Sequence, residues 1–245
     1  MMIATKALVK ELSTLKDRSV RRAKGLFLAE GYNLIKDLDI PARMLLVTQE
    51  SCLDGIKSSP TECYLVSEEQ LSKISGTVTP QGVVGVYDIP DLSIKPPSSR
   101  CLVMDGVTDP GNMGTLIRTA VATGYRDVYL IDSTDPYAGK AVRASMGGIF
   151  GVNIYEGTAP EVISCLRSVG HDIAILDMAG NNIFDYKCDG DNVALVVGSE
   201  AHGISDIFRK NANISLSLPM DKGMESLNAS VAGGISMYML RYLNK

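Results

Sequence analysis

Side chains capable of chemistry gather in three loops, each of which follows an apolar run and leads into a helix-like segment. In the first loop, DGVTDPGNMGTLIRTA from Asp105 to Ala120, a proline-glycine pair forces a turn before a helix predicted from about Met113 to Thr123. Its polar candidates are Asn112 and Arg118. If both residues were helical, the six positions between them would rotate their side chains by about 600°, or 240° after a full turn is removed, so they would not share a face. The two can face one site only if Asn112 precedes the helix and the turn redirects it. The alternative is that Asn112 is the helix N-cap and Arg118 a surface cation.

The second loop is VVGSEAHGIS, from Val196 to Ser205, where a continuous apolar strand runs into Gly198, Ser199 and Glu200. An acid in this place is exposed at the carboxyl end of the strand. Alternatively, Ser199 and Glu200 cap the following helix, because an acidic residue in a first turn complements the helix dipole. We assign His202 no catalytic role.

The third loop, from Leu218 to Tyr238, also leaves an apolar strand and enters a helix predicted from about Ser226 through Leu227 and Asn228. The helix is rich in small residues, which let another element pack closely, although each glycine costs about 1 kcal/mol of helix stability relative to alanine. The close contact could be a helix-sheet contact inside the monomer, a cofactor loop or a subunit interface.

Regular alternation of strand-like and helix-like segments after Cys101 positions these loops. Such alternation predicts an α/β fold with a mostly parallel sheet, in which ligands bind beyond the carboxyl ends of the strands. The predicted strands are CLVMD, DVYLID, GVNIY, DIAILDM, NVALVVG and ISLSL, and further helices are predicted near Lys140–Phe150, in PEVISCLRSV and near Ile204–Asn211.

A linker is predicted at DLSIKPPSSR, Asp91 to Arg100, since its prolines and serines suit neither a sheet nor a helix. We therefore predict two domains, residues 1–95 and 96–245. The first is a small α/β domain whose predicted elements are a basic helical segment, strands Met44–Thr48, Cys63–Val66 and Val83–Ile89, and a helix in SEEQLSKIS.

The charge distribution points to a polyanionic partner for the N-terminal segment. The chain of 245 residues has a formal net charge of −4, yet residues 1–26 hold seven basic and two acidic residues, a balance of +5, which leaves −9 for the remainder. Such a segment could neutralise phosphates, and the alternative is a solvated helix. The candidate RNA-binding residues are Arg18, Arg21, Arg22 and Lys24.

Composition excludes several classes of protein. No apolar run approaches the roughly 20 residues that span a bilayer, and the N-terminus lacks a signal-peptide core, so we expect a cytoplasmic protein. The five cysteines are scattered and predicted to be reduced, and with two histidines no metal site is expected. The first loop lacks the G-x-G-x-x-G spacing of a dinucleotide site, and no hydrolase elbow or P-loop occurs.

Together, DPGNMGTLIRTA, GSEAHGIS and LPMDKGMESLNASVAGG resemble, in this order, the three signature motifs of the SpoU, or TrmH-like, family of the SPOUT methyltransferase class. The resemblance covers Cys101–Lys245. The stretch RRAKGLFLAEG, Arg21 to Gly31, more briefly resembles the start of the ribosomal-protein-like substrate-binding domain of such enzymes. Departures are Ala201 and His202, where glycine and a polar residue are common, and Ala229, where valine is usual.

The resemblance implies an S-adenosylmethionine-dependent methyltransferase that acts on a ribose 2′-hydroxyl of structured RNA. It further implies a trefoil-knotted C-terminal domain, one of the rare exceptions to unknotted folding, and a homodimer formed through that domain. Ribosomal RNA is favoured as the substrate, and the alternatives are a tRNA ribose methyltransferase, a base methyltransferase or a catalytically silent RNA-binding homologue. The implied cofactor-binding residues are Gly198, Ser199, Leu218, Met220 and Leu227.

By the same resemblance Arg118 is the catalytic residue, often described as the base. A guanidinium is almost never neutral in a protein, so an alternative is that Arg118 holds the adjacent phosphate and stabilises the developing alkoxide while a phosphate oxygen or water takes the proton. Glu200 would then fix Arg118 or the ribose. Asn112, Ser226 and Asn228 would support this arrangement through hydrogen bonds.

Overall fold

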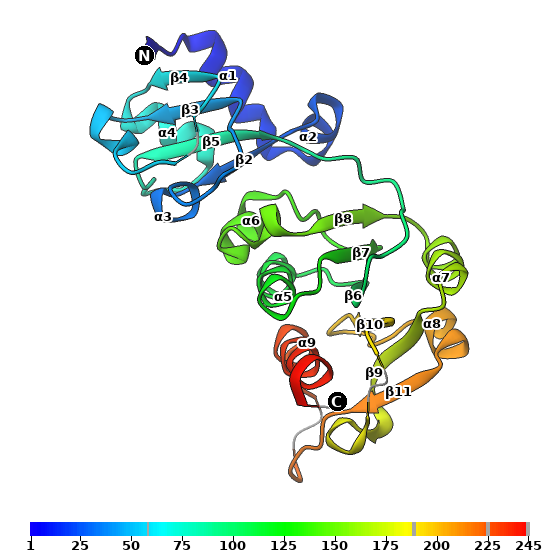
Figure 1. Ribbon diagram of the computed structural model, residues 1–245. Helices are drawn as coiled ribbons and strands as arrows, with labels where there is room; N and C mark the ends of the chain where they lie inside the picture. The colour runs from blue at the N-terminus through cyan, green and yellow to red at the C-terminus, as the bar shows by residue number, and fades with distance from the viewer. Residues whose placement is uncertain (58, 188–189, 224–225, 244–245) are drawn as a thin grey trace. The chain divides into compact units, whose positions relative to one another are not determined.

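The computed structural model describes residues 1–245 except 58, 188–189, 224–225 and 244–245. The chain forms two compact units (Figure 1). Unit 1 consists of Met1–Pro90 together with Asp135–Phe150, and unit 2 consists of Asp91–Thr134 and Gly151–Lys245. The segment Asp135–Phe150 therefore belongs to unit 1 although unit 2 contains the sequence on both sides of it.

Unit 1 is built on a five-stranded mixed sheet in the order β1-β4-β3-β5-β2. β4 pairs in parallel with β1 and β3, whereas β5 pairs antiparallel with β3 and β2. The strands are β1 (Met2–Ile3), β2 (Leu26–Glu30), β3 (Met44–Val47), β4 (Glu62–Leu65) and β5 (Val83–Asp88). The three strands that the sequence predicted are present to within one residue, and β2, in the resembling stretch, was not predicted as a strand.

Side chains cap the N-terminal ends of several helices of unit 1. Asp17 caps α2 by accepting hydrogen bonds from the hydroxyl and the backbone nitrogen of Ser19, and these bonds lower the pKa of Asp17 below its ordinary value. Ser67 and Gln70 form a capping box at the start of α4. The helices are α1 (Lys6–Ser13), α2 (Arg18–Lys24), α3 (Tyr32–Ile35), α4 (Glu68–Ser75) and α6 (Gly139–Ser145), with a 3₁₀ turn at Thr14–Lys16.

Aromatic side chains join the segment Asp135–Phe150 to the rest of unit 1. Phe27 lies 4.8 Å from Tyr137 and 5.6 Å from Phe150 between ring centroids, and Tyr87 meets Phe150 edge to face at 4.7 Å. Rings at these separations attract each other beyond simple burial. The predicted helix Lys140–Phe150 is shorter than expected because Met146 adopts a left-handed conformation, with φ 48°, at the end of α6.

Unit 2 holds a six-stranded sheet in the order β11-β9-β10-β6-β7-β8, in which every described pairing is parallel. This confirms the predicted α/β fold with a parallel sheet. The strands are β6 (Cys101–Asp105), β7 (Asp127–Ile131), β8 (Asn153–Glu156), β9 (Asp172–Asn182), β10 (Val193–Gly198) and β11 (Ile214–Ser217).

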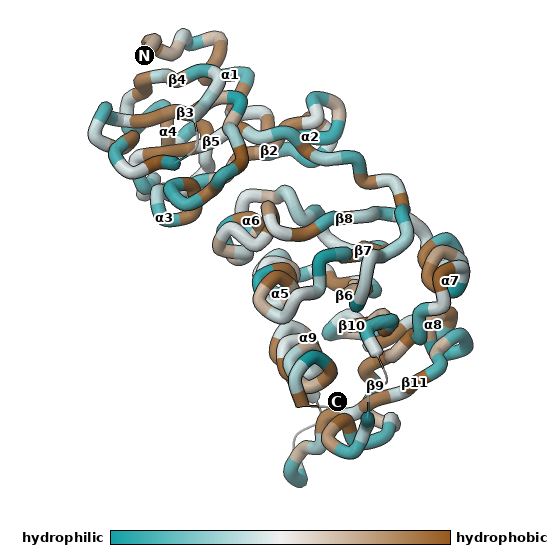
Figure 2. Tube along the Cα trace, viewed as in Figure 1, coloured by the Kyte–Doolittle hydropathy of each residue, from teal (hydrophilic) through white to brown (hydrophobic). Residues whose placement is uncertain are grey.

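The helices of unit 2 are α5 (Pro110–Thr123), α7 (Ala159–Ser168), α8 (Asp206–Asn211) and α9 (Ala229–Tyr238), and a π-helical turn, Met239–Leu243, follows α9. Both hydrophobic and hydrophilic residues occur on α7 and α9 (Figure 2). One hydrophobic core packs residues of α7 and α8, including Val162, Leu166 and Phe208, against the buried strands. Among the described residues no helix is long and apolar enough to cross a bilayer.

The buried carboxylate of Asp127, at the start of β7, binds the end of the predicted linker at Ser98. Asp127 is 2% exposed and accepts hydrogen bonds from the backbone nitrogen and hydroxyl of Ser98, both at 2.9 Å, from Asn153 at 3.0 Å and from Tyr155 at 3.2 Å. Burial, with a further contribution from Asp127, raises the pKa of Tyr155 to about 12. Asp127 therefore has a structural role in this fold.

Candidate active site

A cavity of about 470 Å³ lies in unit 2 where β10 and β11 end, beside the middle of β9. This volume is within the roughly 300–1,000 Å³ that is usual for small-molecule sites. Its walls come from residues 176–178 within β9, the loop after β10, α8, the loop after β11 and the start of α9. The lining residues are Leu176, Asp177, Met178, Val197, Gly198, Ser199, Glu200, His202, Gly203, Ile204, Arg209, Leu216, Ser217, Leu218, Met220, Ser226, Leu227, Asn228, Ala229 and Ala232.

The loop after β10, residues 198–205, is a closed turn. The backbones of Ser199 and Gly203 exchange hydrogen bonds of 3.1 and 2.9 Å, and the hydroxyl of Ser199 accepts from the nitrogen of His202 at 3.0 Å. A Cβ on Gly198 would lie 2.3 Å from the carbonyl carbon of Gly203. Only glycine permits this close approach of backbone to backbone.

We name this loop the cofactor loop, after the role that the motif resemblance implies for it. Two contacts hold it to the first loop, Asp105 to Ala120. A carboxylate oxygen of Asp105, at the end of β6, accepts a hydrogen bond of 2.7 Å from the backbone nitrogen of Ser205. At the tip of the loop, the side-chain nitrogen of Asn112 donates to a carboxylate oxygen of Glu200. In this chain the carboxylate of Glu200 therefore contacts Asn112 and not Arg118, which was one of the two partners predicted for it, the other being the ribose.

The first helix begins earlier than predicted, which changes the place of Asn112. α5 starts at Pro110 and is capped by Asp109, whose carboxylate accepts from the nitrogen of Asn112 at 2.9 Å. Asn112 lies inside the first turn, so the expectations that it precedes the helix or serves as its N-cap are wrong. Asn112 and Arg118 are therefore separated by about 240° around the axis of one helix, or about 120° by the shorter way, so they do not share a face.

Arg118 is exposed and does not line the cavity. Within the described part of the chain it has neither a hydrogen bond nor an ion pair. The helix that carries it packs beside α9, where a Cβ on Gly234 would lie 3.7 Å from a side-chain carbon of Thr119. The side chain of Arg118 is thus accessible to a group outside this chain, and it does not contact the cavity of its own chain.

The third motif closes the cavity and starts α9. The side-chain oxygen of Asn228 caps this helix by accepting from the nitrogen of Ser230 at 3.0 Å, its hydroxyl at 2.7 Å and the nitrogen of Val231 at 3.3 Å. A Cβ on Gly233 would come within 2.5 Å of Leu116 on α5 and 3.1 Å of Val197 on β10. The small residues therefore serve a tight contact inside the monomer, and α9 begins at Ala229, three residues after the predicted start.

Of the predicted site residues, the structure brings most around one cavity. Glu200, Ser226 and Asn228 line it. The five predicted cofactor residues, Gly198, Ser199, Leu218, Met220 and Leu227, line it as well. Sequence reasoning missed Asp177 and Met178 on β9 and Arg209 on α8, although the predicted strand DIAILDM ends with the first two of these residues.

The character of the cavity suits a ligand that combines an apolar ring with positive charge. Leucine, valine and isoleucine side chains form much of the wall, and the carboxylate of Glu200 lies on it, whereas that of Asp177 is paired with the guanidinium of Arg209 in the same wall. Such a wall favours the adenine and the sulfonium cation of S-adenosylmethionine. Among the described residues there is no group of three or more His, Cys, Asp and Glu side chains placed to hold a metal ion.

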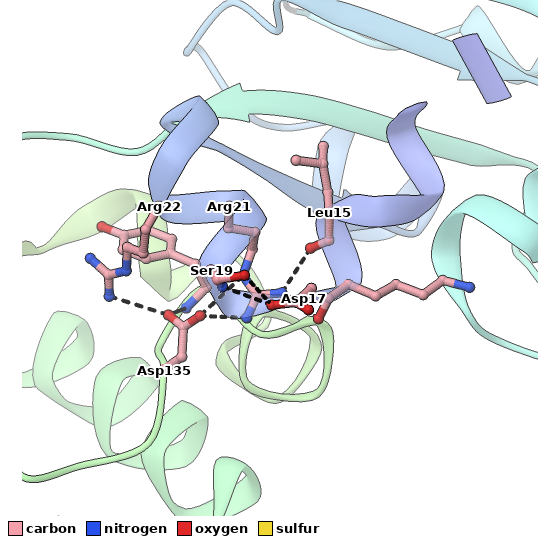
Figure 3. Close-up of polar contacts among 8 residues, drawn as sticks. Leu15, Asp17, Ser19, Arg21, Arg22 and Asp135 are labelled. Carbon is pink, nitrogen blue, oxygen red and sulfur yellow. Dashed lines mark hydrogen bonds and ion pairs between the residues drawn. The ribbon is translucent and has the colours of Figure 1, made fainter. Parts of the chain in front are cut away.

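The basic N-terminal residues have different surroundings (Figure 3). Arg21 is 3% exposed, and its guanidinium donates to Asp135 and to the carbonyl oxygens of Leu15 and Lys16, both at 2.7 Å. The prediction that Arg21 binds RNA is therefore corrected, because its donors are used inside unit 1. Three other candidates reach the surface: Arg18 is exposed, Arg22 is partly buried 3.4 Å from Asp135, and Lys24 pairs with Glu11 at 2.6 Å.

The four cysteines that the structure describes do not line the cavity. Cys52, Cys63, Cys101 and Cys165 are free thiols, and Cys188 lies outside the described residues. Burial raises the pKa of Cys101 well above its ordinary value and also raises that of Cys165. A thiol with a raised pKa is a poor nucleophile at neutral pH, so these groups give no chemistry to the site.

The fold and the cavity define an α/β enzyme domain with a small-molecule site at the carboxyl edge of a parallel sheet. The chain belongs to the SpoU rRNA Methylase family, which matches residues 99–238, and residues 6–85 match the MRM3-like substrate binding domain. This confirms the family predicted from the three motifs and the substrate-binding domain predicted before it.

Similar proteins match nearly the whole chain. The chain is 30% identical over 95% of each sequence to the 23S rRNA (guanosine(2553)-2′-O)-methyltransferase RlmP of Bacillus subtilis. Its structure is similar to that of a TrmH-family protein from Porphyromonas gingivalis, with a TM-score of 0.88, 28% identity and 98% of each chain covered. The AdoMet-bound rRNA methyltransferase from Sinorhizobium meliloti has a TM-score of 0.83 and 26% identity, over 98% of this chain and 96% of that one.

Proposed function

We propose that this protein transfers a methyl group from S-adenosylmethionine to a ribose 2′-hydroxyl of structured RNA, with ribosomal RNA favoured over transfer RNA. The observation that carries the proposal is that residues of the second and third motifs line one and the same cavity. Family membership and relatives named as 23S rRNA 2′-O-methyltransferases support it. A silent homologue is disfavoured, since Arg118 and Asn228 are both present.

In this proposal the cavity holds the cofactor through Gly198, Ser199, Leu218, Met220 and Leu227. The ribose oxygen would gain the methyl group as the bond from this group to sulfur breaks, which would leave S-adenosylhomocysteine, and the hydroxyl proton would pass to a phosphate oxygen or water. When bound, S-adenosylmethionine supplies a methyl group activated by its sulfonium. The chain contributes a wall that excludes water, backbone groups of the closed cofactor loop, and the carboxylate of Glu200, which favours a cation over a neutral ligand. Gly198 sets the shape of the loop, so its substitution tests the cofactor site directly.

The proposed catalytic residues divide into two groups. Asn112 and Glu200 hold each other at the tip of the cofactor loop, and Ser226 and Asn228 shape the opposite wall. Arg118 would bind the phosphate beside the target ribose and stabilise the oxyanion that develops as the hydroxyl loses its proton, because a guanidinium offers charge and a fork of donors but rarely accepts a proton.

We also propose a homodimer formed through the C-terminal domain, in which Arg118 of one protomer serves the cavity of its partner. An apolar stripe on α9 and the turn after it supports this: Val231, Ile235, Tyr238 and Tyr242 are between 39% and 53% exposed and recur at helical spacing. Arg118 lies on α5, which packs beside α9.

Mixed dimers test this arrangement. A dimer of one Arg118→Ala chain and one Gly198→Ala chain has one complete site only if arginine and cavity come from different protomers. We expect such a dimer to regain activity that neither homodimer has. An inactive mixed dimer would place Arg118 and the cavity that it serves in one chain.

The trefoil knot and the domain roles complete the proposal. The pairing of β11 on the far side of β9 from β10 is compatible with a threaded C-terminal chain. A crystal structure that traces residues 205–243 outside any closed loop would reject the knot.

The two predicted domains have different roles in this proposal. Residues 1–95 would bind RNA through Arg18, Arg22 and Lys24, and residues 96–245 would catalyse the methyl transfer. The protein would act in the cytoplasm.

Two experiments test the function itself. Calorimetric titration with S-adenosylmethionine should give saturable binding to the full chain, and its absence would remove the enzyme assignment. Mapping of 2′-O-methyl groups in RNA from cells with and without the protein should show one site that depends on it. A lost site in tRNA would favour the alternative substrate, and the loss of a base methylation would contradict ribose chemistry.

A further inference from the structure

An ion pair that belongs to none of the three motifs lies in the wall of the cavity. Asp177 is on β9 and Arg209 is on α8, and a carboxylate oxygen of the first contacts a terminal guanidinium nitrogen of the second. Both side chains line the cavity. The carboxylate is 10% exposed and the guanidinium 43%, so the pair lies at the boundary between the protein interior and the space for the ligand.

Each partner is also held by the backbone. The second carboxylate oxygen of Asp177 accepts a hydrogen bond of 3.0 Å from the nitrogen of Ala179, and the Nε of Arg209 donates to the carbonyl oxygen of Ile204 at 3.1 Å. Surface ion pairs are usually weak because two long side chains must be ordered to form them. Here the backbone bonds already fix both groups, which reduces that cost.

The contact with Ile204 connects the pair to the cofactor loop, residues 198–205. A Cβ on Gly203 would lie 3.6 Å from a terminal nitrogen of Arg209, so the guanidinium lies along the outer side of the loop. The first motif holds the loop at its tip and at Ser205. The pair of Asp177 and Arg209 supplies the remaining anchor, from the side of β9.

We propose that Arg209 and Asp177 are positioning residues that hold the cofactor loop in its ligand-binding conformation. The inference rests on the proposed function of the cavity. The pair acts through the loop and does not itself contact the reacting atoms. Loss of the pair therefore weakens cofactor binding by a larger factor than it lowers turnover at saturating cofactor, and it acts on the KM for cofactor and not on the KM for RNA.

The test compares Arg209→Gln, Asp177→Asn and the double variant with a matched control in the full-length chain. The control is Arg167→Gln, because Arg167 donates to the carbonyl oxygen of Asn211, the last residue of α8, and does not line the cavity. Kd is measured by calorimetry for S-adenosylhomocysteine and for 5′-methylthioadenosine, which lacks the amino-acid end.

Each single variant should raise Kd for both ligands by about threefold to tenfold. The double variant should be no weaker than the weaker single variant, since both substitutions break one link. The control should bind like wild type. Arg209→Lys, which keeps the charge but loses the Nε donor, should give an intermediate Kd and provides a milder variant if the others fold poorly.

Three results would overturn the inference: unchanged Kd in both single variants, additive losses in the double variant, or weakening confined to S-adenosylhomocysteine. The last would mean that the pair contacts the amino-acid end of the ligand directly. If wild-type protein bound neither ligand, the proposed function would fail first. If wild type bound both and the variants bound equally well, only the positioning role would be lost.

Discussion

Replacing Asp135 by alanine should destabilise unit 1 severely, because the change leaves a buried guanidinium without its anion. The side chains of Arg21 and Asp135 are 4% and 5% exposed (Figure 3). Removing one partner of such a buried pair typically costs about 3–5 kcal/mol. We expect the lower end, about 3 kcal/mol, since the carbonyl oxygens of Leu15 and Lys16 still accept from Arg21.

The assay is urea unfolding followed by far-ultraviolet circular dichroism and tyrosine fluorescence, since the chain has ten tyrosines and no tryptophan. Hydrogen exchange assigns the loss: peptides from α2 and residues 135–150 should exchange faster, and those from β9 and β10 should not. Glu11→Ala, which breaks an ion pair whose carboxylate is 55% exposed, is the control and should change stability by less than about 1 kcal/mol.

A loss below about 1 kcal/mol for Asp135→Ala would refute the argument. The double variant Arg21→Met with Asp135→Leu provides a second check. It removes both charges and refills the space, so it should recover most of the stability that the single variant loses. If it were as unstable as Asp135→Ala, the cost would come from packing and not from an unpaired charge.

Three further predictions concern other parts of the chain. Gly198→Ala should weaken S-adenosylmethionine binding by at least about tenfold in calorimetry, because the new methyl group would overlap the carbonyl of Gly203; a Kd within about twofold of wild type would contradict this close approach. Arg118→Lys should lower kcat by about a hundredfold with unchanged cofactor Kd and no recovery as pH rises, whereas activity that increases with pH would identify Arg118 as a true base. Burial raises the pKa of Tyr87 to about 12. The contribution of this neutral side chain to the free energy of unfolding is therefore fully present below the ordinary pKa of 10.0, and it is lost as pH rises through 12. Tyr87→Phe should remove that decline in melting temperatures measured from pH 9 to 12, and an identical alkaline slope would assign it to other groups.

The strands and the cavity residues were predictable because their signals are local. Apolar runs such as VALVV mark buried strands of a parallel sheet, and the polar loops that follow them converge at one edge. Helix starts were less accurate: Asp109, and not Asn112, caps α5, since the proline-glycine pair is compatible with a first helical turn.

Contacts between distant parts of the sequence could not be predicted. Arg21 and Asp135 are 114 residues apart, and an arginine among lysines is typical of a solvated, phosphate-binding helix as much as of a buried ion pair. Similarly, DIAILDM predicts a strand, but nothing in it indicates that Asp177 meets an arginine from α8. Such pairings depend on tertiary packing, which a single sequence does not encode locally.

The membership of Asp135–Phe150 in unit 1 has a consequence for protein synthesis. Although Met1–Pro90 leaves the ribosome first, Arg21 lacks its anion and Phe27 lacks two of its aromatic neighbours until residue 150 has emerged. The nascent N-terminal region should therefore stay protease-sensitive on ribosomes stalled near residue 125 and become resistant only on much longer chains. Early resistance would mean that the first ninety residues fold without the later segment.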